Sequence, residues 1–166
     1  MPLQVGDVAP DFTLFVRPRE FVSLHDYAGR PVVLLFFPLA FSPTCTEEIG
    51  AAAEDYTLYE SLGAEIIGVS VDSPFVNQRF AAACNARFPI LSDFDRVVGA
   101  TYGILADDFF GLKGVHHRAA FVIDRDGRVA FAWESENPNV LPPFAKIKQT
   151  LRRLAERDRP VAPAST

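Results

Sequence analysis

The sequence lacks the features that mark secreted and membrane proteins. It contains only two cysteines in 166 residues, Cys45 and Cys84, too few for the disulfide framework of a small secreted domain. No apolar run approaches the roughly 20 residues of a membrane-spanning helix. The first residues show neither the basic start nor the apolar stretch of a signal peptide. The sequence therefore predicts a cytoplasmic protein with no membrane partner.

An excess of positive charge is also missing. Sixteen lysines and arginines stand against 21 acidic residues, for a net charge of −5, so there is no electrostatic reason to expect nucleic acid as a partner. The three histidines form no ligand-spaced cluster with the cysteines, and we predict no metal site. What is present is the composition of a folded domain, 49% hydrophobic and 22% charged. We predict one domain over residues 1–157, with a disordered tail at 158–166.

A buried strand followed by a helix with a cysteine is the most informative stretch. Residues Val32–Phe37 are continuously apolar, which is typical of a strand covered on both faces. Pro38 ends this strand because it has no N–H group for a central sheet. Ser42, followed by proline, predicts a helix start with the hydroxyl as N-cap. Cys45 is then the third helical residue, beside free backbone N–H groups that favour the nucleophilic thiolate. A small core cysteine is the alternative.

The other patterns alternate strands with helices. We predict that Phe75 and Val76 lie on the apolar side of a helix, and that Asp95 caps a short helix. Parallel strand–helix units followed by an antiparallel hairpin and a last helix indicate an α/β, thioredoxin-like fold. Its mixed central sheet is flanked by helices and carries an N-terminal β extension. The predicted strands lie near 12–14, 21–22, 32–37, 65–72, 119–123 and 128–133, and the predicted helices near 43–63, 74–84, 95–101 and 141–154.

Residues around the cysteine resemble a known signature. Pro38-Leu-Ala-Phe-Ser42-Pro-Thr-Cys45 matches the peroxiredoxin pattern Pro-x-x-x-Thr/Ser-x-x-Cys. The segments 5–14, 88–93 and 117–127 resemble the family's opening, its middle and the stretch with its active-site arginine, here Arg118. The residues just before the site resemble the bacterioferritin-comigratory and alkyl-hydroperoxide-reductase-E branches most. The resemblance spans roughly residues 3–155.

This resemblance implies a thiol-dependent peroxidase for hydrogen peroxide and organic hydroperoxides. The Cys45 thiolate would attack the peroxide and become a sulfenic acid. Pro38, Ser42 and Arg118 would shape and polarise the pocket, although capping, strand breaking and surface exposure also explain these residues. Glu48, one turn after the cysteine, would orient the arginine or be a carboxylate on the helix surface. No cofactor is expected, because sulfur carries the redox chemistry.

The second cysteine decides how the enzyme would be recycled. Some family members carry a resolving cysteine five residues after the first, where this chain has Gly50, and some bacterioferritin-comigratory members carry it in the later helix, where Cys84 lies. We predict an intramolecular disulfide between Cys45 and Cys84, opened by a thioredoxin-type reductant. Forming it would require the turn that holds Cys45 to unwind. The alternative is that Cys84 packs in the core of a one-cysteine peroxidase that uses an external thiol.

Two other classes of protein compete with a peroxidase. A disulfide oxidoreductase is disfavoured because the third residue after Cys45 is Glu48, so there is no Cys-x-x-Cys motif. A redox-switched chaperone or sensor would use the same cysteine to change shape. The sequence leaves open the preferred peroxide, the reductant, and whether the protein is a monomer or a homodimer.

Overall fold

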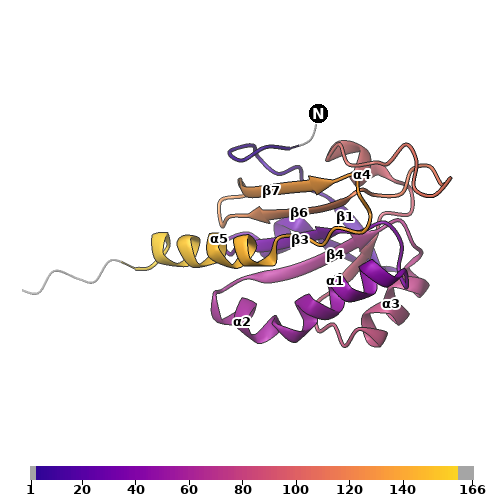
Figure 1. Cartoon of the computed structure of the whole chain (residues 1–166). Coiled ribbons are helices and arrows are strands. Elements are labelled where there is room, and N and C mark those ends of the chain that lie inside the picture. The colour runs from indigo at the N-terminus through magenta and orange to yellow at the C-terminus, as the bar shows by residue number, and fades with distance from the viewer. Residues whose placement is uncertain (1–2, 161–166) are drawn as a thin grey trace, which may run out of the picture.

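The fold is built on one mixed sheet, whose strands run across the view in Figure 1. The computed structural model describes residues 3–160. Seven strands lie in the order β2-β1-β5-β4-β3-β6-β7, with β3 parallel to β4 and antiparallel to β6. The strands are β1 (Thr13–Arg17), β2 (Glu20–Ser23), β3 (Val32–Phe36), β4 (Glu65–Ser70), β5 (Ile90–Ser92), β6 (Arg118–Ile123) and β7 (Val129–Ser135).

Helices flank this sheet. They are the 3-10 turn η1 (Leu24–Tyr27), α1 (Pro43–Glu54), α2 (Tyr56–Ser61), α3 (Pro74–Ala83), α4 (Val97–Thr101) and α5 (Phe144–Arg157). The predicted helix 43–63 is in fact two helices, because Asp55 ends α1 and begins α2. Within residues 3–160, no helix is long and apolar enough to cross a membrane. Residues 161–166, most of the predicted tail, lie outside the described residues.

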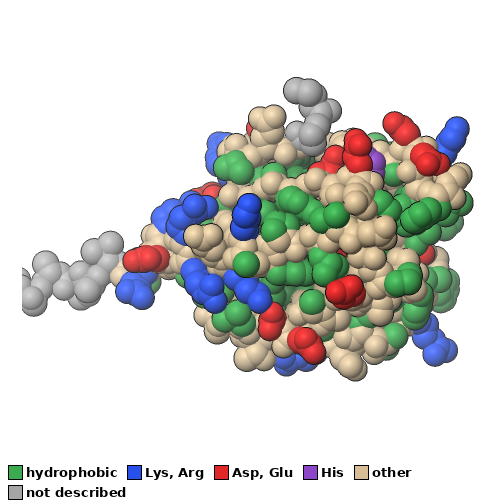
Figure 2. Space-filling view, in the orientation of Figure 1, with side chains coloured by type: hydrophobic (Ala, Val, Ile, Leu, Met, Phe, Trp, Pro, Cys, Tyr) green, Lys and Arg blue, Asp and Glu red, His purple; other side chains and the backbone are tan. Residues whose placement is uncertain are grey.

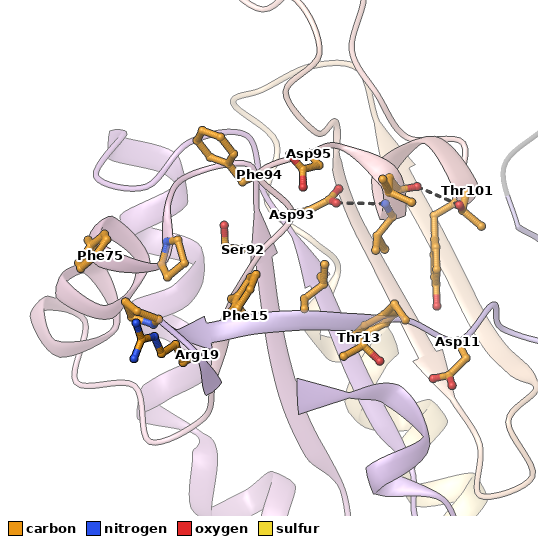
Figure 3. A pocket seen from close by; sticks show the side chains of 17 residues that line it. Asp11, Thr13, Phe15, Arg19, Phe75, Ser92, Asp93, Phe94, Asp95 and Thr101 are labelled. Atoms are coloured by element: carbon orange, nitrogen blue, oxygen red, sulfur yellow. Dashed lines mark hydrogen bonds between the residues drawn. The ribbon is translucent and has the colours of Figure 1, made fainter. Parts of the chain in front are cut away.

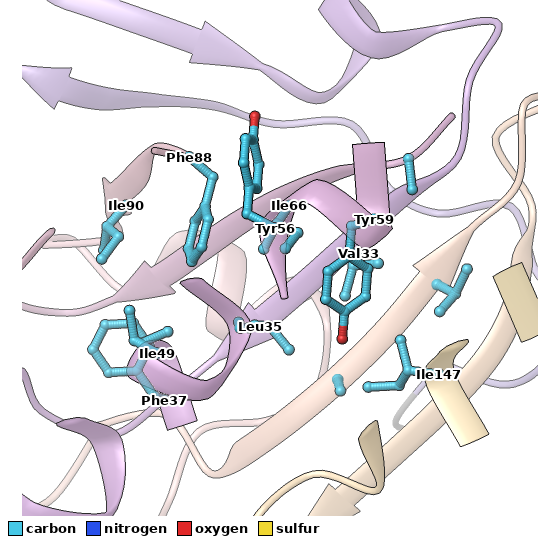
Figure 4. Packing of buried hydrophobic residues seen from close by; sticks show 14 of the residues in the cluster. Val33, Leu35, Phe37, Ile49, Tyr56, Tyr59, Ile66, Phe88, Ile90 and Ile147 are labelled. Atoms are coloured by element: carbon cyan, nitrogen blue, oxygen red, sulfur yellow. The ribbon is translucent and has the colours of Figure 1, made fainter. Parts of the chain in front are cut away.

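The central strand β3 packs into a separate core on each face. Val33 and Leu35 point into a cluster with residues of α1, α2, α3 and α5, part of which is drawn in Figure 4. Val32 and Leu34 point into a second cluster, under the N-terminal segment and Tyr102. Successive strand residues face opposite sides of a sheet, so burial on both sides requires an unbroken apolar run. This explains the pattern that predicted the strand.

Helix α5 covers one of these faces with a single stripe. Ile147, Leu151 and Leu154 are buried at the helical spacing that predicted this helix. Its other side is basic, and Lys and Arg side chains gather over α5 in Figure 2. The helix therefore closes the core with its apolar stripe and leaves its charges to the solvent.

The predicted apolar side of α3 is wrong at its start. Phe75 and Val76 are 67% and 37% exposed, whereas Asn77 and Phe80 are buried. The proline start placed the helix correctly, and the Ser73 hydroxyl accepts a hydrogen bond from Val76 N as an N-cap does. Only the packing against the sheet decides which side of such a short helix turns inward.

The predicted cap of α4 is wrong as well. Asp93, not Asp95, accepts hydrogen bonds from Val98 N (3.0 Å) and Gly99 N (2.8 Å). Asp93 can reach them because Arg96 adopts a left-handed backbone conformation (φ 64°) that folds the chain back. Since a left-handed arginine is uncommon, the sequence gives little indication of this turn.

Candidate active site

Strand pairing brings Arg118 to the start of α1. In the antiparallel pair of β3 and β6, Phe36 lies opposite Ala119. Arg118 precedes Ala119, so its side chain reaches the end of β3, from which a short loop leads into α1. Arg118 is 1% exposed, Cys45 is fully buried, and Arg118 Nη1 lies 3.3 Å from Cys45 Sγ. A guanidinium and a thiol at a helix start are thus in direct contact.

Arg118 is held by two further acceptors. Its Nη1 donates to Glu48 Oε2 at 2.6 Å and its Nη2 to the carbonyl oxygen of Pro138 at 2.8 Å. Glu48 lies one turn after Cys45 on the same side of α1 and is fully buried, so it is not the surface carboxylate that the sequence allowed. Arg118 Nε is buried without an acceptor among the described residues, so the hydrogen-bonding capacity of the guanidinium is not fully used by the contacts with Cys45, Glu48 and Pro138.

The burial of this pair changes its proton equilibria. Burial raises the pKa of Glu48 to about 7, against the opposing effect of the Arg118 charge and its hydrogen bond. For Arg118, burial disfavours the charge, but the neighbouring Glu48 carboxylate and Cys45 sulfur outweigh it and raise the pKa. The guanidinium stays charged, whereas Glu48 changes charge near neutral pH.

Ser42 and Pro38 lie in the loop that precedes Cys45. The Ser42 hydroxyl donates to the carbonyl oxygen of Leu39 at 2.8 Å and does not cap the helix, so the predicted side-chain N-cap is wrong. The Ser42 carbonyl instead accepts from Thr46 N at 2.9 Å. Pro38 is buried directly after β3. The Ser42 hydroxyl, with its proton used on Leu39, can still accept a hydrogen bond.

Two anchors of this loop were not predicted from the sequence. Asp72 Oδ2 accepts from Ala40 N at 2.7 Å. Phe41 is left-handed (φ 69°), with its ring 5.1 Å from that of Phe80. For a bulky residue this backbone conformation costs roughly 1–2 kcal/mol. The only sequence signal for Asp72 is a polar residue just after a buried strand, where functional side chains often lie.

Cys84 caps the C-terminus of α3 and is 8% exposed. Asn85 follows in the left-handed conformation typical of a helix end, so the local sequence fixes this position. Cys84 borders a pocket of about 620 Å³ together with Thr46 and Gly50 of α1. Both cysteines are free, and burial raises the pKa of the Cys84 thiol. The second thiol therefore lies beside α1, the helix that carries Cys45, and shares this pocket with it.

A separate cavity lies away from these residues. It has a volume of about 630 Å³ and is bordered by the rings of Phe15, Phe75 and Phe94 (Figure 3). Cys45 and Arg118 are not among its lining residues. Residues 3–160 contain no group of three or more His, Cys, Asp or Glu side chains that could hold a metal ion.

Comparison with known proteins identifies the family. The model of the AhpC/TSA family matches residues 5–132. The chain belongs to this family. Peroxiredoxin Bcp of Escherichia coli is 33% identical over 136 residues, which are 80% of this chain and 86% of that protein. The predicted peroxiredoxin family, in its bacterioferritin-comigratory type, is confirmed.

Other peroxiredoxins agree in sequence and in structure. The chloroplastic peroxiredoxin Q of Gentiana triflora is 34% identical over 90% of this chain, which spans 65% of that protein, just under two thirds of its length. Peroxidoxin BcpB of Mycobacterium tuberculosis superposes with a TM-score of 0.81 and 28% identity, covering 92% of this chain and 98% of its own. A peroxiredoxin-like protein of Aquifex aeolicus gives 0.83 and 26%, covering 93% and 89%. The predicted thioredoxin-like fold is confirmed.

Proposed function

We propose that the protein is a thiol-dependent peroxidase that reduces hydrogen peroxide and organic hydroperoxides. The observation that carries this proposal is the contact between Arg118 Nη1 and the buried Sγ of Cys45, 3.3 Å apart at the start of α1. A charged guanidinium and the free N–H groups of a helix start both stabilise the thiolate, which is the reactive form of cysteine.

In the first step the Cys45 thiolate attacks one oxygen of the peroxide. The S–O bond forms as the O–O bond breaks, so that the thiolate and ROOH give the sulfenate and ROH. Arg118 stabilises the negative charge that develops on the departing oxygen. The Ser42 hydroxyl accepts a hydrogen bond from the peroxide, and the buried Pro38 keeps water away from the sulfur. Glu48 holds Arg118 in place through the 2.6 Å hydrogen bond.

In the second step Cys84 resolves the sulfenic acid. The Cys84 thiolate attacks the Cys45 sulfur, the S–S bond forms as the S–O bond breaks, and the oxygen leaves as hydroxide, which takes up a proton to give water. The position of Cys84 beside α1 supports this step. Because Cys45 is fully buried and the Cα atoms of a disulfide must come within about 7 Å, the first turn of α1 unwinds. A thioredoxin-type dithiol then reduces the disulfide and is itself oxidised.

The partners of this reaction are a hydroperoxide and a dithiol protein, which we place in the cytoplasm. The net charge of −5 gives no attraction to nucleic acid or to an anionic membrane. No cofactor takes part. The single domain of residues 1–157 acts as a monomer or a homodimer.

Peroxide consumption in the presence of thioredoxin, thioredoxin reductase and NADPH tests the proposal. We expect NADPH oxidation on addition of hydrogen peroxide or cumene hydroperoxide. Cys45→Ser should abolish it, and Cys84→Ser should reduce it while leaving a single turnover of Cys45. Turnover by Cys45→Ser, or no turnover by the wild type with any dithiol, would contradict the proposal. Slow consumption together with a protein partner bound in one redox state only would indicate a redox sensor instead.

A further inference from the structure

We propose that Asp72 is a positioning residue that latches the loop before Cys45 in the arrangement that reacts with peroxide. Breaking its bond to Ala40 then opens the loop for disulfide formation with Cys84. This inference rests on the proposed function, since it concerns the passage from the first step to the second.

The Asp72 carboxylate is itself held rigidly. Its Oδ2 atom, which accepts from Ala40 N at 2.7 Å, also lies 2.8 Å from Ser70 Oγ. The Asp72 backbone is fixed on both sides, because its N–H donates to Ser70 Oγ and its carbonyl accepts from Ser92 Oγ at 2.6 Å. Buried Asn77 joins this network through Ser70 and donates to the carbonyl of Leu91 at 3.1 Å. The acceptor for the loop is thus anchored to β4, β5 and α3 together.

The loop is attached by one hydrogen bond and by apolar packing. Ala40 N bonds to Asp72, and the Phe41 ring packs on Phe80 of α3. Leu39 packs against the buried cluster that contains Val71. Between these contacts Phe41 holds its left-handed backbone, a conformation that persists only where the surroundings enforce it. When the Ala40–Asp72 bond breaks, this strain can relax. The loop therefore has a closed state held by one charge-assisted hydrogen bond together with the packing of Leu39 and Phe41, and an open state favoured by the relief of strain.

Asp72 and Cys84 lie at the two ends of the segment that contains α3. Asp72 stands two residues before the start of α3, and Cys84 caps its end. Cys45 is fully buried while the loop is closed, so Cys84 cannot attack until the first turn of α1 has left its place. That turn follows directly from the loop that Asp72 holds. Closed, the loop keeps Cys45 beside Arg118; open, it frees Cys45 to meet Cys84.

Rapid mixing of the reduced protein with hydrogen peroxide separates the two steps. Sulfenic acid is followed by trapping and mass spectrometry in a Cys84→Ser background. Disulfide formation is followed with Cys84 present by the appearance of the Cys45–Cys84 cross-link in quenched samples, at a peroxide concentration that makes the first step fast. We expect Asp72→Ala to slow sulfenic acid formation about tenfold to a hundredfold, the range for loss of a hydrogen bond to a charged group, and to speed up disulfide formation. Asp72→Asn keeps a carbonyl acceptor and should restore most of the first rate.

Asp26→Asn is the matched control. Asp26 also accepts a hydrogen bond from a backbone N–H, that of Ser23 at 2.9 Å, in the turn η1 that follows β2. It should leave both rates unchanged. Equal slowing of both steps by Asp72→Ala, or rates within twofold of the wild type, would overturn the latch while peroxide reduction by the wild type still supports the proposed function. A wild type that does not react with peroxide would overturn both.

Hydrogen exchange at the Ala40 amide tests the latch without a variant at Asp72. The amide should exchange slowly in the reduced protein and in the Cys84→Ser sulfenic acid, and fast in the disulfide form. Equal protection of Ala40 in the reduced and disulfide forms would show that the bond to Asp72 does not open, and would overturn the inference.

Discussion

Replacing Glu48 by glutamine should change how the stability of the protein depends on pH. Glu48 is fully buried against Arg118, and burial raises its pKa from 4.5 to about 7. Between these two values the folded state holds a proton that the unfolded state has released. The contribution of Glu48 to the free energy of unfolding is therefore fully present below pH 4.5 and is lost as the pH rises through 7. Glutamine has nothing to titrate.

The size of the effect follows from the shift. One pKa unit corresponds to about 1.4 kcal/mol, so raising the pH from 5 to 8 should lower the unfolding free energy of the wild type by about 2 to 3 kcal/mol more than that of Glu48→Gln. Glu48 Oε1 has no partner among the described residues, so the glutamine amide placed there also costs stability. This cost does not depend on pH and cancels when the two pH values are compared.

Urea unfolding of the reduced proteins at pH 5, 6, 7 and 8 measures the difference. Glu47→Gln is the control, since it removes the same charge from the adjacent, exposed position of α1 and should follow the wild type. If Glu48→Gln and the wild type show parallel pH profiles, Glu48 does not titrate near neutral pH, and the electrostatic account of the pair with Arg118 is refuted.

Three further predictions concern the reaction. Arg118→Lys should slow oxidation of Cys45 by peroxide about tenfold to a hundredfold in stopped-flow measurements, because an ammonium cannot reach the sulfur, Glu48 and the Pro138 carbonyl at once; a rate within twofold of the wild type would contradict this. Ser42→Ala should lower the unfolding free energy by only about 1 kcal/mol, since the hydroxyl does not cap α1, yet reduce the peroxide rate about tenfold. Ser42→Thr keeps the hydroxyl and is its control, and an unchanged rate in Ser42→Ala would remove Ser42 from the site. Disulfide formation should accelerate as the pH rises from 7 to 9, because burial raises the pKa of the Cys84 thiol and the fraction of nucleophilic thiolate grows with pH; a flat profile for the appearance of the Cys45–Cys84 disulfide would contradict attack by a buried Cys84.

The local part of the site could be predicted from the sequence. Strand β3, the break at Pro38 and the helix start before Cys45 all follow from rules that act over a few residues. The end of α3 at Cys84 is equally local, since Asn85 favours the left-handed conformation that stops a helix. Even here a detail failed, because the Ser42 hydroxyl bonds to Leu39 and leaves α1 without a side-chain cap.

The partners of these residues could not be predicted in the same way. The sequence allowed Glu48 to be a surface carboxylate, and nothing in it indicated that Asp72 reaches Ala40. Asp93 replaced Asp95 as the cap of α4 because the backbone folds back at Arg96. In each case the partner of the side chain depends on which segments pack together in the folded chain. A local sequence pattern carries no information about contacts between residues that are far apart in the sequence.

The residue pattern alone indicates a thiol at the start of a helix, a sheet buried on both faces and membership of a peroxiredoxin family. What surrounds the thiol depends on how distant segments pack together. The register of β3 with β6 sets Phe36 opposite Ala119 and so brings Arg118 to within 3.3 Å of Cys45, 73 residues away along the chain. Helix and turn preferences act between neighbours, whereas contacts across a sheet are set by the packing of the whole core.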